Sequence, residues 1–419
     1  MSTNTTTGVS SLNILDAAVK LKPVVNRTPL TYSATLSRRY QCDVYLKRED
    51  MQIVRSYKLR GAYNLISSLP ADLLALGVTC ASAGNHAQGF AYACKAMNIK
   101  GVVFMPIITP KQKVNQVRMF GGENIEIRLV GDTFDDCSAE AQAYTKAAGM
   151  TFIPPFDNPK IIEGQGTVAV EILEDQSQVD FLFVPVGGGG LAAGTGTYFK
   201  TYSPKTRIIG VEPEGAASML TALENGGPVT LNEIERFVDG AAVKRVGTLN
   251  YEICKEVLEK MHLVNEGKVC STILKLYNED AIVVEPAGAL SIAALDDFAD
   301  EIRGKKVVCV ISGSNNDIDR MQEIKERSLL YEGLKHYFIV RFAQRPGALK
   351  EFLNHMLGPN DDITRFEYIQ KHNKESGPAL IGIELGRKED YDVLIANFRK
   401  YNLNFTELNK DDNLFGYLV

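Results

Sequence analysis

The residues with the most chemical potential are one lysine and three loops rich in small or polar residues. Lys58 lies in Ser-Tyr-Lys-Leu-Arg-Gly-Ala (56–62), just before good helix-forming sequence. The loops read Ser-Ala-Gly-Asn-His (82–86), Gly-Gly-Gly-Gly-Leu (187–191) and Ser-Gly-Ser-Asn-Asn (312–316). Each follows a strand-like run and precedes a helix-like one. A lysine amine forms an imine with an aldehyde, and helix N-termini hold phosphate, so the set suits a bound phosphorylated aldehyde.

Four consecutive glycines follow an apolar strand predicted at 181–186. They are Gly187, Gly188, Gly189 and Gly190. Without a Cβ they let the backbone come close to a ligand, and their N–H groups can face it. A helix beginning at Leu191 adds its N-terminal dipole, which favours an anion, most simply phosphate.

The same stretch has a second interpretation. Gly188-x-Gly190-x-x-Ala193 satisfies the dinucleotide fingerprint, and Glu212 stands at the end of the next strand, where a ribose partner is expected. Taken alone, the glycines leave NAD and another phosphate ligand as open alternatives.

The other two loops offer polar groups at helix starts. The first comprises Ser82, Ala83, Gly84, Asn85 and His86. Its N–H groups can hold a substrate carboxylate, and its asparagine amide can either cap the helix or bond a ring hydroxyl. The histidine is a candidate base, although a lone histidine is more often structural. Ser312 ends another strand, and Asn316 or Asp317 is better placed to cap the following helix, which leaves the Ser312 hydroxyl available.

Alternating strand and helix patterns must position these loops. Strands are expected at 43–47, 77–81, 101–105, 125–130, 151–153, 181–186, 207–211 and 306–311. Helices are expected at 12–21, 59–69, 88–97, 133–148, 166–174, 191–200 and 317–328, with another opening at Pro110. Repeated βα units with continuous apolar strands indicate doubly wound parallel sheets, and their number favours two α/β lobes. The strand ends should meet in a crevice at the carboxyl edge.

The pattern changes near residue 330. Strands at 335–342, 362–370 and 379–385, helices at 349–356 and 388–401, and a closing strand follow the β-α-β-β-α-β order of a ferredoxin-like α+β domain. We therefore expect a catalytic part at 1–328, with its smaller lobe at about 44–150, and a binding or regulatory module at 335–419.

Bulk properties exclude several classes of protein. The chain has 419 residues, 45% of them hydrophobic, and a net charge of −5, which makes nucleic acid and acidic membranes poor partners. It shows neither a signal peptide nor an apolar run long enough to span a membrane. Seven scattered cysteines without a C-x-x-C pair fit a reducing cytoplasm and indicate no metal site.

The motifs in this order resemble the fold-type II pyridoxal-phosphate (PLP) enzymes, most closely the threonine dehydratases, over about 12–328. The C-terminal sequence resembles the ACT-like regulatory domain of the biosynthetic form. The resemblance implies that Lys58 binds the cofactor aldehyde and later takes the substrate α-proton. Asn85 would donate a hydrogen bond to the ring oxygen, and residues 187–191 would bind the phosphate. Ser312 would form a hydrogen bond with the pyridine nitrogen. Residues 82–86 would hold the substrate carboxylate.

The implied reaction converts L-threonine to 2-oxobutanoate and ammonia, and L-serine to pyruvate, as the first step of isoleucine biosynthesis. Isoleucine inhibition, valine as a further effector and a homo-oligomer, either dimer or tetramer, are expected by the same resemblance. Related serine racemases carry a serine where Ala83 stands, so racemisation should be weak here. The alternatives are a catabolic threonine/serine dehydratase, an NAD-dependent oxidoreductase and a non-catalytic amino-acid sensor.

Overall fold

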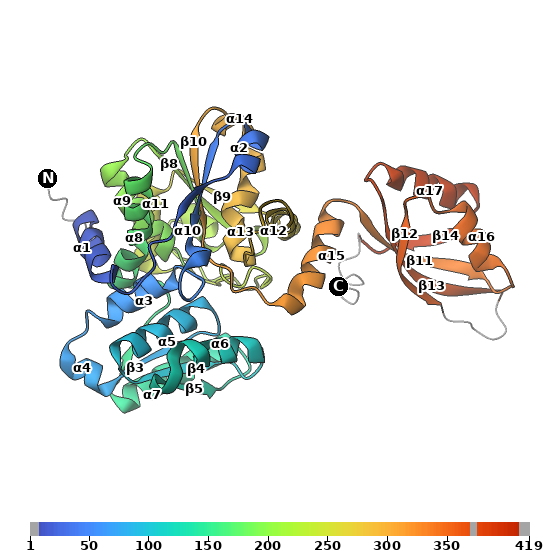
Figure 1. Cartoon of the computed structure of the whole chain (residues 1–419). Coiled ribbons are helices and arrows are strands. Elements are labelled where there is room, and N and C mark those ends of the chain that lie inside the picture. The colour runs from blue at the N-terminus through green and yellow to red at the C-terminus, as the bar shows by residue number, and fades with distance from the viewer. Residues whose placement is uncertain (1–7, 369–374, 410–419) are drawn as a thin grey trace. The chain divides into compact units, whose positions relative to one another are not determined.

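The chain folds into two compact units, Met1–Asp317 and Ile318–Val419. The computed structural model describes residues 8–368 and 375–409. The N-terminal unit contains two α/β lobes, each built on its own sheet, and the C-terminal unit is built on a third sheet (Figure 1). The predicted fold class, two α/β lobes followed by an α+β module, is confirmed.

The larger lobe contains a six-stranded sheet in the order β1-β2-β10-β7-β8-β9. Its strands are β1 (Leu30–Tyr32), β2 (Asp43–Arg48), β7 (Phe181–Pro185), β8 (Arg207–Pro213), β9 (Lys260–Val264) and β10 (Lys306–Ile311). All neighbours are parallel except β1, which is antiparallel to β2. The central strands β7 and β10 are almost wholly buried, as their continuous apolar sequences require.

Helices cover both faces of the larger sheet. On one face, alternate residues of β7 and β10, such as Leu182 and Val308, pack in a single core with four helices. These are α1 (Ser11–Leu21), α8 (Pro159–Asp175), α9 (Gly190–Tyr202) and α11 (Thr248–Val257). The helix α13 (Pro286–Ala293) packs against β7 and β10, and α12 (Glu266–Asp280) packs against α13. Shorter helices are α2 (Ala34–Tyr40), α10 (Ser218–Glu224) and α14 (Ala299–Ile302).

The smaller lobe contains a fully parallel sheet in the order β5-β4-β3-β6. Its strands are β3 (Val78–Ala81), β4 (Gly101–Met105), β5 (Ile125–Leu129) and β6 (Thr151–Phe152). Its helices are α4 (Ala71–Leu76), α5 (Asn85–Met97), α6 (Lys111–Gly121) and α7 (Phe134–Ala148). Val103 packs in the core that includes α5, while the next residue, Phe104, packs in the core that includes α7. Successive side chains of β4 thus point to opposite helical layers, as a doubly wound sheet demands.

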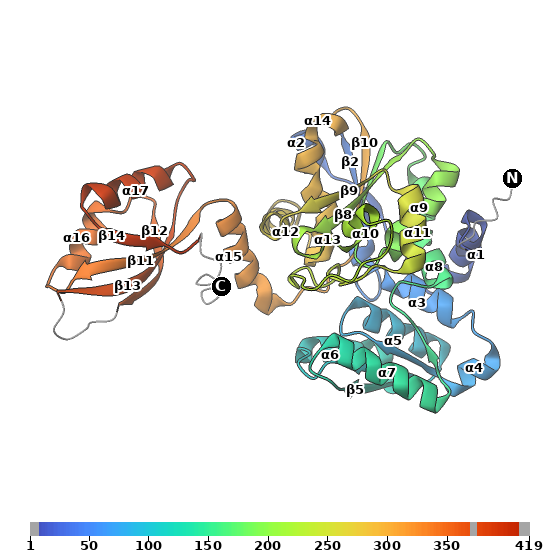
Figure 2. The same ribbon diagram turned by 180° about the vertical axis from the view of Figure 1, so that it is seen from behind.

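Helix α3 (Lys58–Ile66) lies where the two lobes meet, in the front view and from behind (Figures 1 and 2). It packs against α5 of the smaller lobe and α8 of the larger one. The close packing of α3 against α5 depends on Gly89 of α5, because a Cβ at that position would lie 2.8 Å from the Leu59 nitrogen. Lys58, the first residue of α3, is therefore placed between the lobes.

The C-terminal unit begins at Ile318, inside the part predicted as catalytic (1–328). It contains α15 (Met321–Tyr331) and an antiparallel sheet in the order β12-β13-β11-β14. Its strands are β11 (Lys335–Ala343), β12 (Asp362–Tyr368), β13 (Ser376–Glu384) and β14 (Asn404–Glu407), and its helices are α16 (Ala348–His355) and α17 (Asp390–Lys400). Phe338 and Phe342 share one face of β11 and contact Phe398 of α17 and Phe352 of α16 respectively. Both helices therefore cover the same face, in the ferredoxin-like arrangement.

Three expectations require correction. The strand predicted at 43–47 pairs with β10 of the larger sheet, and the small sheet runs from Val78 to Phe152, so residues 44–48 do not belong to the smaller lobe. Helix α8 begins at Pro159, earlier than predicted, because Asn158 caps it. Pro110 is itself the N-cap residue of α6. Of the strand predicted at 362–370, the last two positions lie outside the described residues.

Candidate active site

Backbone hydrogen bonds attach the Lys58 loop to the end of β10. The Tyr57 N–H donates to the Ser312 carbonyl oxygen at 3.2 Å, and the Ser314 N–H donates to the Arg55 carbonyl oxygen at 2.9 Å. Ser56 and Gly313 form an isolated antiparallel bridge between these contacts. Two motifs far apart in sequence, the lysine loop and the 312–316 loop, are thus joined directly.

The Lys58 ammonium group faces a loop that crosses between the lobes. Its Nζ donates to the Pro155 carbonyl oxygen at 3.1 Å. Burial of the amine lowers the Lys58 pKa from 10.5 to about 8, while the carboxylate of Glu285 acts in the opposite direction. A neutral amine is the form that attacks an aldehyde or takes a proton, so this environment suits both tasks.

A buried ionic network holds α3 in place, two residues beyond the lysine. Arg60 donates to both oxygens of Glu49, at 2.8 Å each, and to both oxygens of Glu171, at 2.7 and 3.0 Å. Lys47 of β2 also donates to Glu171, at 2.5 Å. Two cations therefore meet two anions, which offsets the cost of burying each charge. The network connects α3, α8 and β2, and so fixes the helix that begins with Lys58.

The glycine loop presents its two sides to different surroundings. The Gly188 carbonyl oxygen accepts from the Asn250 side chain at 2.6 Å and from the Gly247 N–H at 3.2 Å. Because C=O and N–H of one planar peptide point in opposite directions, the Gly189 N–H faces away from α11. Within the described residues, the N–H groups of Gly188, Gly189 and Gly190 donate to no protein acceptor.

Protein atoms pack tightly against the Gly188 Cα. A Cβ there would lie 2.2 Å from the Phe156 ring, next to the Pro155 that contacts Lys58. Gly189 has a φ of +93°, a conformation that favours glycine. The unpaired N–H groups thus stand at the N-terminus of α9, a 13-residue helix whose dipole favours an anion.

Asn85 is held between two side chains that come from distant parts of the sequence. Its Nδ2 donates to Glu285 Oε1 at 2.7 Å, and its Oδ1 accepts from Asn315 Nδ2 at 2.7 Å. Asn315 also donates to the Val54 carbonyl oxygen at 2.9 Å. The predicted site residue Asn85 is thereby connected to both the 312–316 loop and the segment before Lys58.

Ser312 is largely buried as a residue, and within the described part of the chain its hydroxyl makes no hydrogen bond. Its oxygen is, however, not one of the fully enclosed side-chain atoms that lack a partner. The hydroxyl is therefore accessible and can pair with a ligand atom. The site thus combines a low-pKa amine, unpaired N–H groups at a helix N-terminus, an oriented amide and a free hydroxyl. This donor set fits PLP, whose aldehyde, phosphate, ring oxygen and ring nitrogen each require one such partner.

The 82–86 loop occupies the start of α5, and its members remain half-buried except His86, which is buried. Ser82 Oγ accepts from the Gly84 N–H at 3.2 Å, which shapes the loop. His86 Nε2 lies 2.9 Å from the Ile153 carbonyl oxygen, and burial together with Lys58 lowers its pKa to about 3. The imidazole is therefore neutral and donates to that carbonyl, as expected of a structural histidine.

The dinucleotide interpretation fails at Glu212. Its side chain is buried, and its two carboxylate oxygens accept from the N–H groups of Met219 at 2.7 Å and Leu220 at 3.0 Å. A carboxylate that caps α10 in this way is not available for a ribose.

The Ser218 hydroxyl, close to Glu212 in sequence, donates to the Val243 carbonyl oxygen. The described residues include no group of three or more acidic, histidine or cysteine side chains placed to hold a metal.

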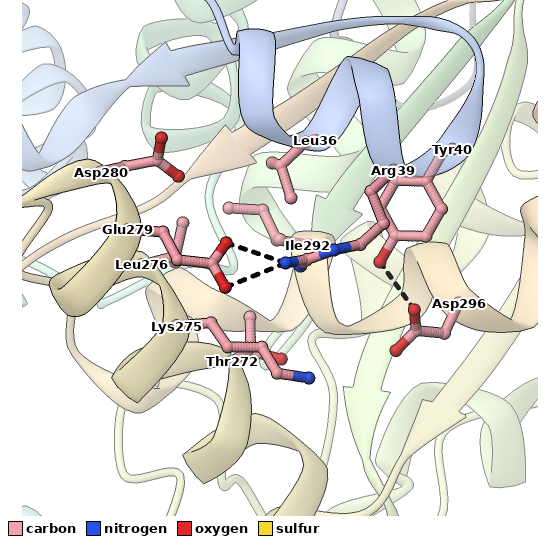
Figure 3. Close-up of a pocket in the computed structure, with 10 residues that line it drawn as sticks. All are labelled: Leu36, Arg39, Tyr40, Thr272, Lys275, Leu276, Glu279, Asp280, Ile292 and Asp296. Carbon is pink, nitrogen blue, oxygen red and sulfur yellow. Dashed lines mark hydrogen bonds and ion pairs between the residues drawn. The ribbon is translucent and has the colours of Figure 1, made fainter.

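A small cavity elsewhere in the larger lobe does not compete with this site. It lies among α2, α12 and α13, and Figure 3 shows Arg39 paired with Glu279 and Tyr40 bonded to Asp296 within it. Its volume of about 20 Å³ holds little more than one water molecule. None of the predicted site residues lines it.

Sequence reasoning missed several residues of the site. Glu285 and Asn250 lie in the segment between β8 and β10, for which no role was predicted, and Pro155 and Phe156 lie in an apparently ordinary loop. The run Glu285-Pro286-Ala287-Gly288 at the start of α13 was the available signal, because a proline at the first helical position followed by small residues marks a tightly packed helix start.

Comparisons with known proteins agree with this geometry. Residues 21–313 match the family described as pyridoxal-phosphate dependent enzyme, and residues 326–418 match the C-terminal regulatory domain of threonine dehydratase. The biosynthetic L-threonine dehydratase IlvA of Halalkalibacterium halodurans is 58% identical, covering 97% of this chain and 98% of that protein. The corresponding protein of Bacillus subtilis is 56% identical, covering 97% of each.

Solved structures give the same result. The processed form of threonine deaminase isoform 2 from Solanum lycopersicum has a TM-score of 0.73 and 38% identity, covering 76% of this chain and 93% of that chain. Serine racemase from Dictyostelium discoideum has a TM-score of 0.69 and 31% identity, covering 74% of this chain and all of that one.

Proposed function

Because the chain belongs to the pyridoxal-phosphate dependent enzymes and carries the C-terminal regulatory domain of threonine dehydratase, we propose that it deaminates L-threonine to 2-oxobutanoate and ammonia. L-serine would give pyruvate in the same site. The observation that carries the proposal is the convergence of Lys58, Asn85, residues 187–191 and Ser312 at the carboxyl ends of the strands, where α/β sheets bind ligands.

The cofactor would be held by four parts of the chain. Lys58 Nζ would bind its aldehyde carbon, and the Asn85 amide would donate to its ring oxygen. The N–H groups of residues 187–191 would hold its phosphate. The Ser312 hydroxyl would donate to its pyridine nitrogen. When bound, PLP supplies a conjugated electron-withdrawing system that acidifies the α-hydrogen of an attached amino acid. A serine hydroxyl, unlike a carboxylate, does not stabilise a proton on the pyridine nitrogen, which favours elimination over a long-lived carbanion.

Lys58 also serves as the base. Its Nζ would take the α-proton, and burial, which lowers the Lys58 pKa to about 8, favours the neutral amine that this step needs. The N–H groups at the start of α5 orient the substrate carboxylate beside it. Ala83 has no proton to give to the opposite face, so elimination is favoured over racemisation.

The regulatory unit would bind isoleucine, and valine as a second effector, so that the end product controls the first step of its own synthesis. The family of the module at 326–418 supports this assignment. We further propose a homo-oligomer, dimer or tetramer, working in the cytoplasm, where the seven cysteines, which form no disulfide, stay reduced. Among the described residues, no helix has the length and apolarity needed to cross a membrane.

The proposal is tested with purified protein supplied with PLP. Wild type should show the visible absorbance of lysine-bound cofactor and release ammonia from L-threonine, and Lys58→Ala should lose both. Persistence of that absorbance in Lys58→Ala would refute the role of Lys58. Isoleucine added to the wild-type assay separates the biosynthetic role from a catabolic one, because a catabolic enzyme would not lose activity.

A further inference from the structure

Glu285 contacts the proposed cofactor residue Asn85, yet none of the motifs explains its presence. We propose that Glu285 is a positioning residue: its carboxylate fixes the Asn85 amide for the cofactor ring oxygen and provides the negative charge opposite Lys58. This inference rests on the proposed function, because it assigns a task to Glu285 within that same site.

The hydrogen bonds around Asn85 permit one orientation of its amide. Nδ2 has two hydrogens, and one of them is donated to Glu285 Oε1 at 2.7 Å. Oδ1 accepts from Asn315 at 2.7 Å. Rotating the amide by half a turn would place an oxygen against the Glu285 carboxylate and a donor against the Asn315 donor. The second Nδ2 hydrogen therefore has a fixed direction and remains available for a ligand oxygen.

The structure is built closely around this carboxylate. The Glu285 N–H donates to the Gly313 carbonyl oxygen at 3.2 Å. A Cβ on Gly313 would lie 2.6 Å from Glu285 Oε1, so this neighbour must be small. The Glu285 side chain does not cap α13, although Glu285 is the N-cap residue. Its carboxylate instead points to Asn85.

The charges facing Glu285 come from several elements. Asp239 repels its anionic form, whereas Lys113 of α6, the Asn85 side chain and the Asn315 N–H stabilise it, and Lys58 of α3 interacts with it across the site. Burial dominates and raises the Glu285 pKa to about 7. The carboxylate is therefore charged above this pH and becomes protonated below it, where it no longer balances a positive charge at position 58.

A double-mutant cycle tests the positioning role, with the dissociation constant of PLP as its readout. Asn85→Ala and Glu285→Ala should each weaken cofactor binding by about tenfold, as expected for hydrogen bonds that involve a charged group. The double variant should be no weaker than the poorer single variant, because both changes remove one shared contact. If the increases in the PLP dissociation constant caused by the two single changes multiply in the double variant, the positioning role is refuted.

Glu285→Gln tests the charge without removing the side chain, and it keeps the experiment valid if Glu285→Ala does not fold. Its amide oxygen still accepts from Asn85, so PLP affinity should stay within about threefold of wild type. The pH titration of bound-cofactor absorbance should lose a transition near 7. The matched control is Glu233→Gln, which removes an exposed glutamate of the same lobe and should titrate as wild type does.

The outcomes separate the two proposals. If wild type binds no PLP, the proposed function is wrong. If wild type binds PLP and Glu285→Gln titrates as wild type does, only the charge role of Glu285 is refuted.

Discussion

The backbone N–H of Tyr57 donates to the carbonyl oxygen of Ser312 at 3.2 Å. This single bond joins the residue before Lys58, the proposed cofactor-binding lysine, to the residue whose hydroxyl would meet the cofactor ring. Since α3 begins directly after Tyr57 and β10 ends directly before Ser312, the bond fixes the position of Lys58 relative to Ser312.

The uptake of PLP by apo-protein should depend on pH through Lys58. The unprotonated amine is the nucleophile, and its pKa is lowered to about 8 by burial. Below that value the rate should rise about tenfold per pH unit, and above it the rate should level off. Stopped-flow absorbance between about pH 6 and 9 measures the profile. A rate that keeps rising to the highest pH, like that of an exposed lysine, would contradict the lowered pKa.

Gly188→Ala should damage the phosphate site. Its Cβ would lie 2.2 Å from the Phe156 ring, so either the loop or the ring must move. We expect PLP affinity to fall by about tenfold or more, because N–H groups only 1 Å out of place lose their hydrogen bonds. Equilibrium dialysis measures the change. Gly227→Ala, which adds a methyl group where no heavy atom lies within 4 Å, is the control and should bind PLP normally.

Glu171→Gln should destabilise the N-terminal unit. It leaves the buried cations of Arg60 and Lys47 with one carboxylate, Glu49, at a cost of about 3 kcal/mol or more. The thermal midpoint of wild type and variant measures the loss. Glu174→Gln, on the same helix, breaks an exposed pair with Arg27 and should cost at most about 1 kcal/mol.

The effect of Glu171 should also depend on pH. Burial raises the pKa of Glu171, but its pairing with Arg60 and Lys47 outweighs this effect and lowers its folded-state pKa below 4.5. Its contribution is therefore complete above the unfolded-state pKa and disappears as the pH falls through the folded-state pKa. Equal stabilities of wild type and Glu171→Gln at neutral pH would contradict the ionic role of the network.

Tyr337→Phe should weaken inhibition by isoleucine. The Tyr337 hydroxyl of β11 donates to Glu326 of α15 at 2.6 Å, and α15 directly follows the 312–316 loop in sequence. Loosening this contact should raise the isoleucine concentration for half-inhibition several-fold, with the uninhibited rate unchanged. Initial rates at increasing isoleucine measure it. The control Tyr401→Phe removes a hydroxyl from an exposed tyrosine of the same unit, and equal shifts in both variants would refute the specific role of this contact.

Most residues of the proposed site were predictable because they lie in short sequence motifs. The glycine loop, Asn85 and Ser312 each follow a strand and precede a helix, and Lys58 begins a helix after a loop. Local periodicity identifies such junctions. The α/β alternation and the change of pattern near residue 330 follow from the same local signals. Four motifs in a fixed order also carried the family resemblance.

The sequence by itself therefore determined the elements, the cofactor chemistry and the family. Only the tertiary structure decided that β2 belongs to the larger sheet, that Phe156 packs against Gly188, and that Glu285 faces Asn85. The physical reason is that hydrophobic periodicity depends on neighbours along the chain, whereas strand order and side-chain contacts depend on how distant segments pack. Glu212 gives the clearest case: its position fitted a ribose contact, and its burial against α10 excludes one.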